Sequence, residues 1–215
     1  PAAARNRGVR AATGAWILFT DDDCRPDVGW AGALAERLRA GAAVAAGPTE
    51  VTAIARPPAR AAQVITNHLV RESFDVATSS VGFAPTCNLG VSADLLARLP
   101  FDERYSLAAG EDRDWCDRVA GMGEVVAWVP AATVAHHPAL TLRSFWNQQV
   151  RYGQGAHRFR SGAAGHRPRP PARFYARLVG RGFRGGVRVG LLVVLAQFAT
   201  AAGVVRAARG AVRRN

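Results

Sequence analysis

The chain has 215 residues with 28 Lys+Arg against 16 Asp+Glu, a formal net charge of +12, and no lysine among the cations. Residues 1–140 hold 13 arginines and all 16 acids, whereas residues 141–215 hold 15 arginines and no acid. Hydrophobic residues make up 49% of the sequence, which excludes wholesale disorder. The three cysteines are too few and too scattered for a disulfide framework or a zinc cluster, and they favour a reducing, cytosolic setting. We therefore expect a nearly neutral domain over 1–140 and a cationic tail over 141–215.

The first informative element is the apolar run GAWILFT, residues 14–20, which ends in three consecutive acids. A continuous apolar run of this length predicts a strand buried on both faces, as in a parallel α/β sheet. Pro26 and Asp27 then open a predicted helix through ALAERL that stops near Gly41. Because ligands in such sheets gather at the carboxyl ends of strands, the acids stand where a ligand site is expected.

The three acids are Asp21, Asp22 and Asp23. Adjacent carboxylates repel one another unless a cation or hydrogen-bond donors compensate them. On an extended segment Asp21 and Asp23 point the same way while Asp22 points elsewhere. Two hard oxygen ligands on one side suit Mg²⁺ or Mn²⁺ bridging to phosphates. The alternative is a solvated acidic turn that caps the following helix.

A second acidic group opens a predicted helix after Gly110. Acids in a first helical turn are stabilised by the helix dipole, which accounts for Asp114 and Asp117. The dipole explains the pair Glu111 and Asp112 less well, since a carboxylate there could act as a general base over a cleft.

Two short predicted strands follow, EVVAWVP and ATVAHH, and the second ends in His136 and His137. A lone histidine is usually structural. Histidines that end a strand in an acid-rich α/β domain are better candidates for metal ligands.

The tail begins with a predicted amphipathic helix, TLRSFWNQQVRYGQGAHRFR, followed by a Gly/Pro/Arg-rich hinge, SGAAGHRPRPPAR. Residues 189–205 then form an uncharged stretch of 17 residues with arginines on both sides. A spanning helix needs about 20 apolar residues, so this pattern favours an interfacial or re-entrant helix over a clean span. The uncharged stretch favours an anionic membrane surface over nucleic acid as the partner; the alternative is a helix that packs on the body.

The order of these segments resembles the family 2 glycosyltransferases of the GT-A fold. The resemblance covers about residues 4–155 and is carried by ARNRGVRAATGAWILFTDDDC, NLGVSADLLARLPFDERY, AGEDRDWCDRV and VPAATVAHH. It implies a Rossmann-like mixed α/β sheet flanked by helices, followed by the basic helical tail. It also implies a nucleotide-diphosphate sugar donor, Mg²⁺ or Mn²⁺, and inverting transfer to the hydroxyl of a carbohydrate or lipid-linked acceptor at the cytosolic face of a membrane.

The resemblance also assigns roles to residues. Asp21 and Asp23 match the DxD motif, the first toward the nucleotide ribose and the last toward the metal, with Asp22 at the variable position. His136 matches the histidine that completes metal coordination, and Asp112 matches the catalytic base, with Glu111 beside it. The remaining matches concern the donor: Arg5 and Asn6 of the ARN segment near the nucleotide, and Gln148, Arg151 and Tyr152 of a QxxRW-like motif with Tyr in place of Trp.

One departure from the family concerns the start of the sequence. The family's opening strands, of the types VSVVIPTYN and VDDGS, do not precede ARN here. We therefore expect an N-terminally incomplete sheet and poor donor binding by these residues alone, which calorimetry with UDP, GDP and dTDP plus Mn²⁺ would test. Two rival interpretations are a non-catalytic remnant that binds membrane or protein, and a basic nucleic-acid-binding protein supported only by charge.

Overall fold

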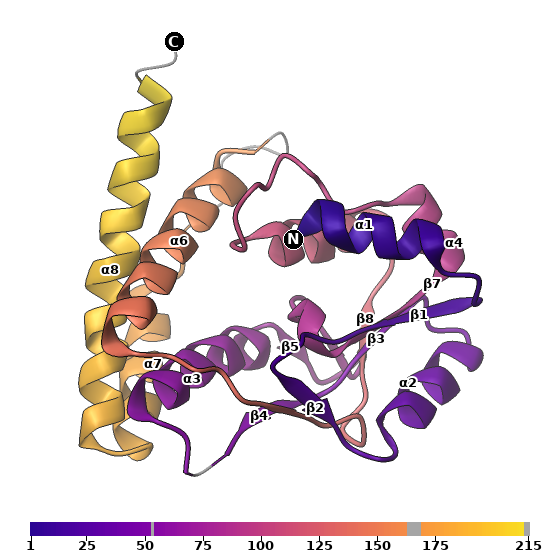
Figure 1. The fold of residues 1–215 in the computed structure, drawn as a ribbon, viewed down its shortest axis with the longest axis horizontal. Helices are drawn as coiled ribbons and strands as arrows, with labels where there is room; N and C mark the ends of the chain where they lie inside the picture. The colour runs from indigo at the N-terminus through magenta and orange to yellow at the C-terminus, as the bar shows by residue number, and fades with distance from the viewer. Residues whose placement is uncertain (53, 163–168, 213–215) are drawn as a thin grey trace. The chain divides into compact units, whose positions relative to one another are not determined.

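The computed structural model describes residues 1–52, 54–162 and 169–212 (Figure 1). The chain divides into two compact units. The first comprises Pro1–Thr52, Leu69–Arg104 and Glu111–Pro138, and the second comprises Ala53–His68, Tyr105–Gly110 and Ala139–Asn215. One boundary between the units lies between Pro138 and Ala139, and two short segments from within residues 1–138 belong to the second unit.

The first unit is built around a six-stranded mixed sheet with the order β1-β7-β3-β8-β6-β5. Only the β3–β8 pair is parallel; the other four pairs of this sheet are antiparallel. The strands are β1 (Trp16–Phe19), β3 (Val44–Ala46), β5 (Phe74–Asp75), β6 (Ser80–Val81), β7 (Leu89–Ser92) and β8 (Val126–Trp128).

A smaller three-stranded sheet has the order β2-β9-β4. Its strands are β2 (Cys24–Pro26), β4 (Thr49–Val51) and β9 (Val134–His136). β9 pairs antiparallel with β2 and parallel with β4, in a register that places His136 opposite both Cys24 and Val51. This register determines which residues meet at the acidic turn.

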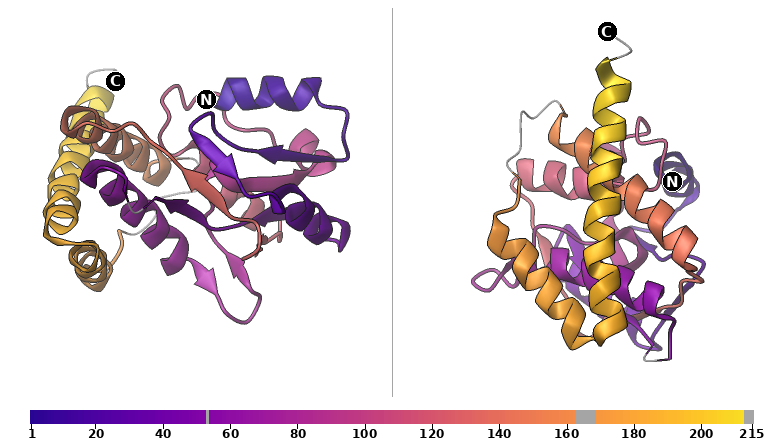
Figure 2. Two further views of the ribbon diagram at one scale, coloured as in Figure 1. Left: turned by 60° about the horizontal axis from the view of Figure 1, so that its bottom comes forward. Right: turned by 90° about the vertical axis from the view of Figure 1, so that its left-hand side faces the viewer.

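Helices cover both faces of the six-stranded sheet. Side chains alternate along a strand, so Val44 and Ala46 of β3 enter one apolar cluster while Ala45 enters another. The first cluster includes residues of α1, α4 and α5, and the second is built on α2; Figures 1 and 2 show α1 and α2 on opposite sides of the sheet. The helices are α1 (Ala2–Ala11), α2 (Trp30–Arg39), α4 (Ala93–Arg98) and α5 (Glu111–Gly121), with the short 3-10 turn η1 (Thr86–Asn88) before β7.

Two details of the expected strand and helix pattern need correction. The GAWILFT strand, β1, is first in the sheet order, pairs antiparallel with β7, and all four of its residues are only half-buried. It is therefore not a parallel strand buried on both faces. Pro26 lies in β2 and the helix that it was expected to open, α2, begins at Trp30. Ser92 caps α4, with its hydroxyl accepting from the Leu95 N–H.

The second unit is helical. It contains most of α3 (Pro57–Glu72) together with α6 (Leu142–Arg160), α7 (Ala172–Arg184) and α8 (Val187–Val212). The predicted amphipathic helix is α6, which Thr141 caps through a reciprocal pair of hydrogen bonds with Ser144. The expected hinge falls partly on residues 163–168, which lie outside the described residues.

α6 and α8 approach each other at two glycines. A Cβ added at Gly153 would lie 2.0 Å from the Thr200 carbonyl oxygen, and one added at Gly203 would lie 2.0 Å from that of Val150. The two backbones are therefore in direct contact at this crossing. An apolar cluster of α3, α6, α7 and α8 residues forms the core of the unit.

Candidate active site

The acidic turn connects β1 to β2 in the first unit. Because Cys24 pairs with His136 across the β2–β9 ladder, the residue before Cys24 also comes next to this histidine. The Asp23 Oδ2 atom lies 3.3 Å from His136 Nε2. The neighbouring His137 donates its backbone N–H to the Asp23 carbonyl at 2.8 Å, and its side chain is exposed. The structure thus brings together Asp23 and His136, two of the three predicted metal ligands.

Cys24 joins this pair, although we did not predict it as a ligand from the sequence. Ligand atoms of Asp23, Cys24 and His136 all lie within 4.8 Å of one another. The Cys24 thiol lies 3.8 Å from Asp23 Oδ1, and a hydrogen bond with the Cys87 thiol lowers the pKa of Cys24. The sequence did offer one signal for Cys24. It directly follows the three acids, so its sulfur adds a further possible ligand atom at the same turn.

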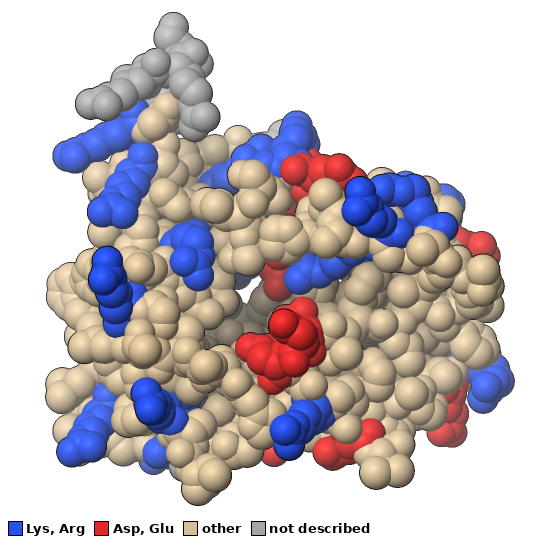
Figure 3. All heavy atoms as spheres, in the orientation of Figure 1, with Lys and Arg blue, Asp and Glu red and all other residues tan. Residues whose placement is uncertain are grey.

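The fit of this turn to a divalent ion can be judged from its donors. A carboxylate and an imidazole suit Mn²⁺, while the adjacent thiol would add a softer ligand. The side chains of Asp23 and His136 are 43% and 23% exposed, so both are within reach of a ligand from solvent. Figure 3 shows acidic side chains gathered on the surface where the chain enters β2.

Asp21, the third predicted metal ligand, is not among these clustered ligand atoms in the described residues. Desolvation raises the pKa of its carboxyl, and the negative charges of Asp23 and Asp22 act in the same direction. The positive charge of Arg5 opposes this shift, and His136 opposes it as well. Asp22 is exposed.

The second acidic group lies at the start of α5. Gly110 precedes it with φ +90°, a left-handed conformation that other residues rarely adopt, and this turn starts the helix at Glu111. Glu111 is 4% exposed, and its Oε1 accepts a hydrogen bond from Arg5 Nη1 at 2.9 Å. Its other carboxylate oxygen, Oε2, is buried and has no hydrogen-bond partner among the described residues.

Asp112, the predicted base, is half-buried. Burial raises the pKa of Asp112 to about 6; the Glu111 charge adds to the shift, and Arg5 opposes it. The backbone N–H of Arg113 donates to Asp112 Oδ1 at 2.8 Å. A carboxyl with a pKa about 6 is mostly ionised at neutral pH yet more basic than an ordinary aspartate, which suits a general base.

Arg5 links the two acidic groups electrostatically. It forms the ion pair with Glu111, and its positive charge opposes the upward shift in the pKa of both Asp21 and Asp112, which burial causes. Its guanidinium also lies 5.6 Å from the centre of the Phe101 ring. The acidic turn and the start of α5 therefore both interact electrostatically with the Arg5 guanidinium.

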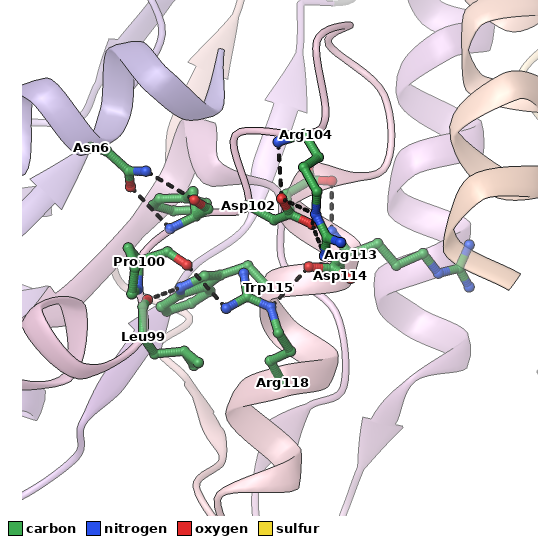
Figure 4. A network of polar contacts seen from close by, with 11 residues as sticks. Asn6, Leu99, Pro100, Asp102, Arg104, Arg113, Asp114, Trp115 and Arg118 are labelled. Carbon is green, nitrogen blue, oxygen red and sulfur yellow. Dashed lines mark hydrogen bonds and ion pairs between the residues drawn. The ribbon is translucent and has the colours of Figure 1, made fainter. Parts of the chain in front are cut away.

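Asn6, predicted near the nucleotide, has a buried side chain that holds a loop. Its Nδ2 donates to the Phe101 carbonyl and to Glu103 Oε1, both at 2.9 Å, and its Oδ1 accepts from the Phe101 N–H at 2.9 Å. Residues of α5 hold the same loop: Trp115 donates to the Leu99 carbonyl and Arg118 to that of Pro100 (Figure 4). These bonds connect α1 to α5 and so help to place Glu111 and Asp112; a contact of Asn6 with the nucleotide remains a prediction.

The QxxRW-like residues Gln148, Arg151 and Tyr152 lie on α6, in the second unit. Arg151 and Tyr152 are exposed, and Gln148 is half-buried.

Comparison with known proteins finds similarity to one enzyme family. Residues 1–98 match the model of glycosyl transferase family 2. The pre-mycofactocin glycosyltransferases of two Mycobacterium tuberculosis strains, CDC 1551 / Oshkosh and ATCC 25618 / H37Rv, are each 28% identical over 161 residues. The chain is thus similar to glycosyl transferase family 2 over its first 98 residues. The match with the mycobacterial proteins covers 73% of this chain and 34% of each relative, so the chain spans about a third of their length.

The fold agrees with the family. A mannosyltransferase from Pyrobaculum calidifontis, solved in complex with GDP-Man and Mn²⁺, matches with a TM-score of 0.54 and 18% identity. The match covers 99% of this chain and 59% of that protein. The mixed sheet flanked by helices is thus a GT-A fold, as the sequence motifs implied.

Proposed function

We propose that this chain carries the catalytic centre of an inverting, metal-dependent glycosyltransferase. The enzyme moves a sugar from a nucleotide-diphosphate donor to an acceptor hydroxyl of a carbohydrate or lipid-linked acceptor. One observation supports the proposal. The pair Asp23 and His136 and the carboxylate of Asp112, whose pKa is raised, lie in the same unit, and the charge of Arg5 influences the pKa of both Asp21 and Asp112.

In this proposal Asp112 is the general base. Its carboxylate accepts the proton of the acceptor hydroxyl while that oxygen forms a bond to the anomeric carbon of the donor sugar. The bond between this carbon and the diphosphate oxygen breaks, and its electron pair leaves with the nucleotide diphosphate. A single displacement of this kind inverts the anomeric centre and needs no covalent enzyme intermediate.

Glu111 and Arg5 act as positioning residues for this base. Arg5 neutralises a carboxylate that is buried beside Asp112, and Glu111 keeps the arginine close to the start of α5. Burial raises the pKa of Asp112 to about 6, with the Glu111 charge adding to this shift and the Arg5 charge opposing it. The base is therefore ionised at neutral pH and still able to take a proton.

Asp23 and His136 would hold Mg²⁺ or Mn²⁺, with Asp21 toward the ribose of the donor. A divalent ion there neutralises charge that develops on the leaving diphosphate. Asn6 and Asp22 would lie near the nucleotide. Gln148, Arg151 and Tyr152 would contact the donor, Arg151 by a bidentate hydrogen bond to the diphosphate.

Metal binding provides the first test. We expect Mn²⁺ binding, measured by electron paramagnetic resonance on the 215-residue chain, to weaken at least about tenfold in Asp23→Asn and in His136→Ala. His137→Ala is the matched control, because this exposed neighbour contributes only its backbone to the turn. Equal losses in His136→Ala and His137→Ala would contradict the assignment.

Donor turnover provides the second test. Release of nucleotide diphosphate is measured for a panel of donors with the natural gene product that carries this sequence, beginning with GDP-mannose because the Pyrobaculum protein was solved with it. We expect release of nucleotide diphosphate to require an acceptor and, in addition, a divalent ion, either Mn²⁺ or Mg²⁺. A protein that binds donor and metal and turns over none of the panel would instead support a non-catalytic role.

A further inference from the structure

The two units differ completely in charge. All 16 acidic residues of the sequence lie in the first unit with eleven arginines, whereas the second unit contains seventeen arginines and no acidic residue. Over α8 the surface in Figure 3 shows blue and tan spheres and no red. The exposed arginines of α7 and α8 are Arg173, Arg177, Arg184, Arg188, Arg206 and Arg209. A surface of this composition is complementary to a polyanion.

α8 presents two opposite faces within this unit. One face is buried against α6 and α7 and consists of small and branched residues, including Val193, Ala196 and Gly203. The other is exposed and apolar: Val187, Leu191, Phe198 and Val205 are 68%, 58%, 66% and 47% exposed. At 3.6 residues per turn, these four residues fall within about 40° of one another around the helix. They form a straight stripe, which we call the outer stripe of α8.

Arginines mark both ends of the outer stripe. Arg188 precedes its central part and Arg206 and Arg209 follow it, and all three are exposed. Long arginine side chains can reach lipid phosphates while the apolar residues between them enter the boundary of the acyl chains. A nucleic acid would use the arginines but would leave the apolar stripe unexplained.

The packing of α8 argues against a membrane span. Val187–Gly210 is the one helical segment in the described chain that is long and apolar enough to cross a bilayer, with mean hydropathy 1.8. However, α8 is in backbone contact with α6 at Gly153 and Gly203. α6 carries exposed Arg143, Arg151 and Arg158, which the hydrocarbon core disfavours. Immersing all of α8 would either take α6 into the bilayer or separate the two helices.

We propose that the second unit docks on an anionic bilayer through the outer stripe of α8, with this helix lying flat in the interface instead of crossing the membrane. The proposal is independent of the catalytic assignment, since none of its residues belongs to the proposed active site. In this arrangement α8 contacts one leaflet of the bilayer and does not reach the other leaflet.

Vesicle co-sedimentation of the 215-residue chain tests the docking. We expect at least tenfold tighter binding to vesicles that contain phosphatidylglycerol than to pure phosphatidylcholine, with affinity falling as salt increases. The double variant Leu191→Glu/Phe198→Glu should lose at least tenfold in affinity. Val76→Glu is the matched control, because Val76 is 80% exposed in the first unit, and it should bind as wild type.

Depth measurements test the orientation. Nitroxide labels on Leu191→Cys, Phe198→Cys and Val205→Cys, in a Cys24→Ser background, should report similar, shallow depths if α8 lies flat. Graded depths that pass through the bilayer centre would overturn the flat arrangement. Absent vesicle binding would overturn the proposal. A different outcome would also overturn it: analytical ultracentrifugation shows a dimer of the wild-type chain, the Leu191→Glu/Phe198→Glu variant is a monomer, and this variant binds vesicles as wild type does.

Discussion

At the residue scale, the chemistry of the site depends on how three charged side chains share one environment. Burial raises the pKa of Asp112, the proposed base; the charge of Glu111 adds to this shift and the charge of Arg5 opposes it. The ion pair between Arg5 and Glu111 joins residues 106 positions apart in the sequence. Sequence motifs identified each of the three separately; their pairing emerges only when α1 and α5 meet.

Charge substitutions next to Asp112 should move its pKa in opposite directions. Arg5→Gln removes a positive charge and should raise the pKa of Asp112 above about 6, whereas Glu111→Gln removes a negative charge and should lower it. Carboxyl ¹³C NMR titration of the 215-residue chain measures this directly. Arg7→Gln, an exposed arginine of the same helix, serves as the control and should leave the titration unchanged. Shifts of the same sign in both variants would contradict the arrangement.

The raised pKa of Asp112 also predicts a pH-dependent cost in stability. Its folded-state pKa of about 6 lies above the ordinary value of 3.8, so the folded protein holds a proton that the unfolded chain releases between these values. Stability is therefore lost as pH rises from about 4 to 6. Asp112→Asn does not titrate and should be more stable than wild type by up to about 3 kcal/mol at pH 8, with no gain below pH 4.

Chemical unfolding of Asp112→Asn and wild type at several pH values measures this difference. If Asp112→Asn is more stable than wild type by the same amount at pH 4 and pH 8, the burial of the Asp112 charge is not the cause of the difference.

At the element scale, part of the order of helices and strands could be predicted from the sequence. The apolar runs of β1, β8 and β9 and the acidic first turn of α5 are local signals, and the structure has a strand or a helix at each of them. The helix α1 and the short strands β2, β5 and β6 were not predicted. The pairing of β1 could not be predicted in this way, because an apolar run is equally compatible with a parallel and an antiparallel neighbour. Cys24 was missed for a similar reason: only the β2–β9 register brings it to His136.

The glycine crossing of α6 and α8 gives a prediction at this scale. Gly203→Ala places a Cβ 2.0 Å from the Val150 carbonyl oxygen, so the helices must separate. We expect a loss of about 3 kcal/mol in the free energy of unfolding. Gly180→Ala on α7 is the matched control: nothing lies within 4 Å of the added Cβ, and replacing a helical glycine should stabilise the chain by up to about 1 kcal/mol.

Thermal unfolding of the two alanine variants compares the positions. Equal midpoints in Gly203→Ala and Gly180→Ala would show that α6 and α8 do not touch at this crossing.

At the scale of the whole molecule, charge separates two tasks. Every acidic residue lies in the unit that contains both acidic groups of the proposed active site, while the acid-free unit presents arginines and an apolar helix face. The net charge of +12 is thus the sum of an acidic and a strongly basic body. Composition alone revealed this asymmetry, but the exact partition required knowing that residues 53–68 and 105–110 belong to the helical unit.

The most direct test of the catalytic account is the rate of sugar transfer by Asp112→Asn in the natural gene product that carries this sequence. The substitution preserves size and the acceptor for the Arg113 N–H but removes the base. We predict a loss of about 10²–10⁴-fold in turnover, with nucleotide and Mn²⁺ binding unchanged. Turnover within a few-fold of wild type would show that Asp112 does not take the acceptor proton, and would contradict the account.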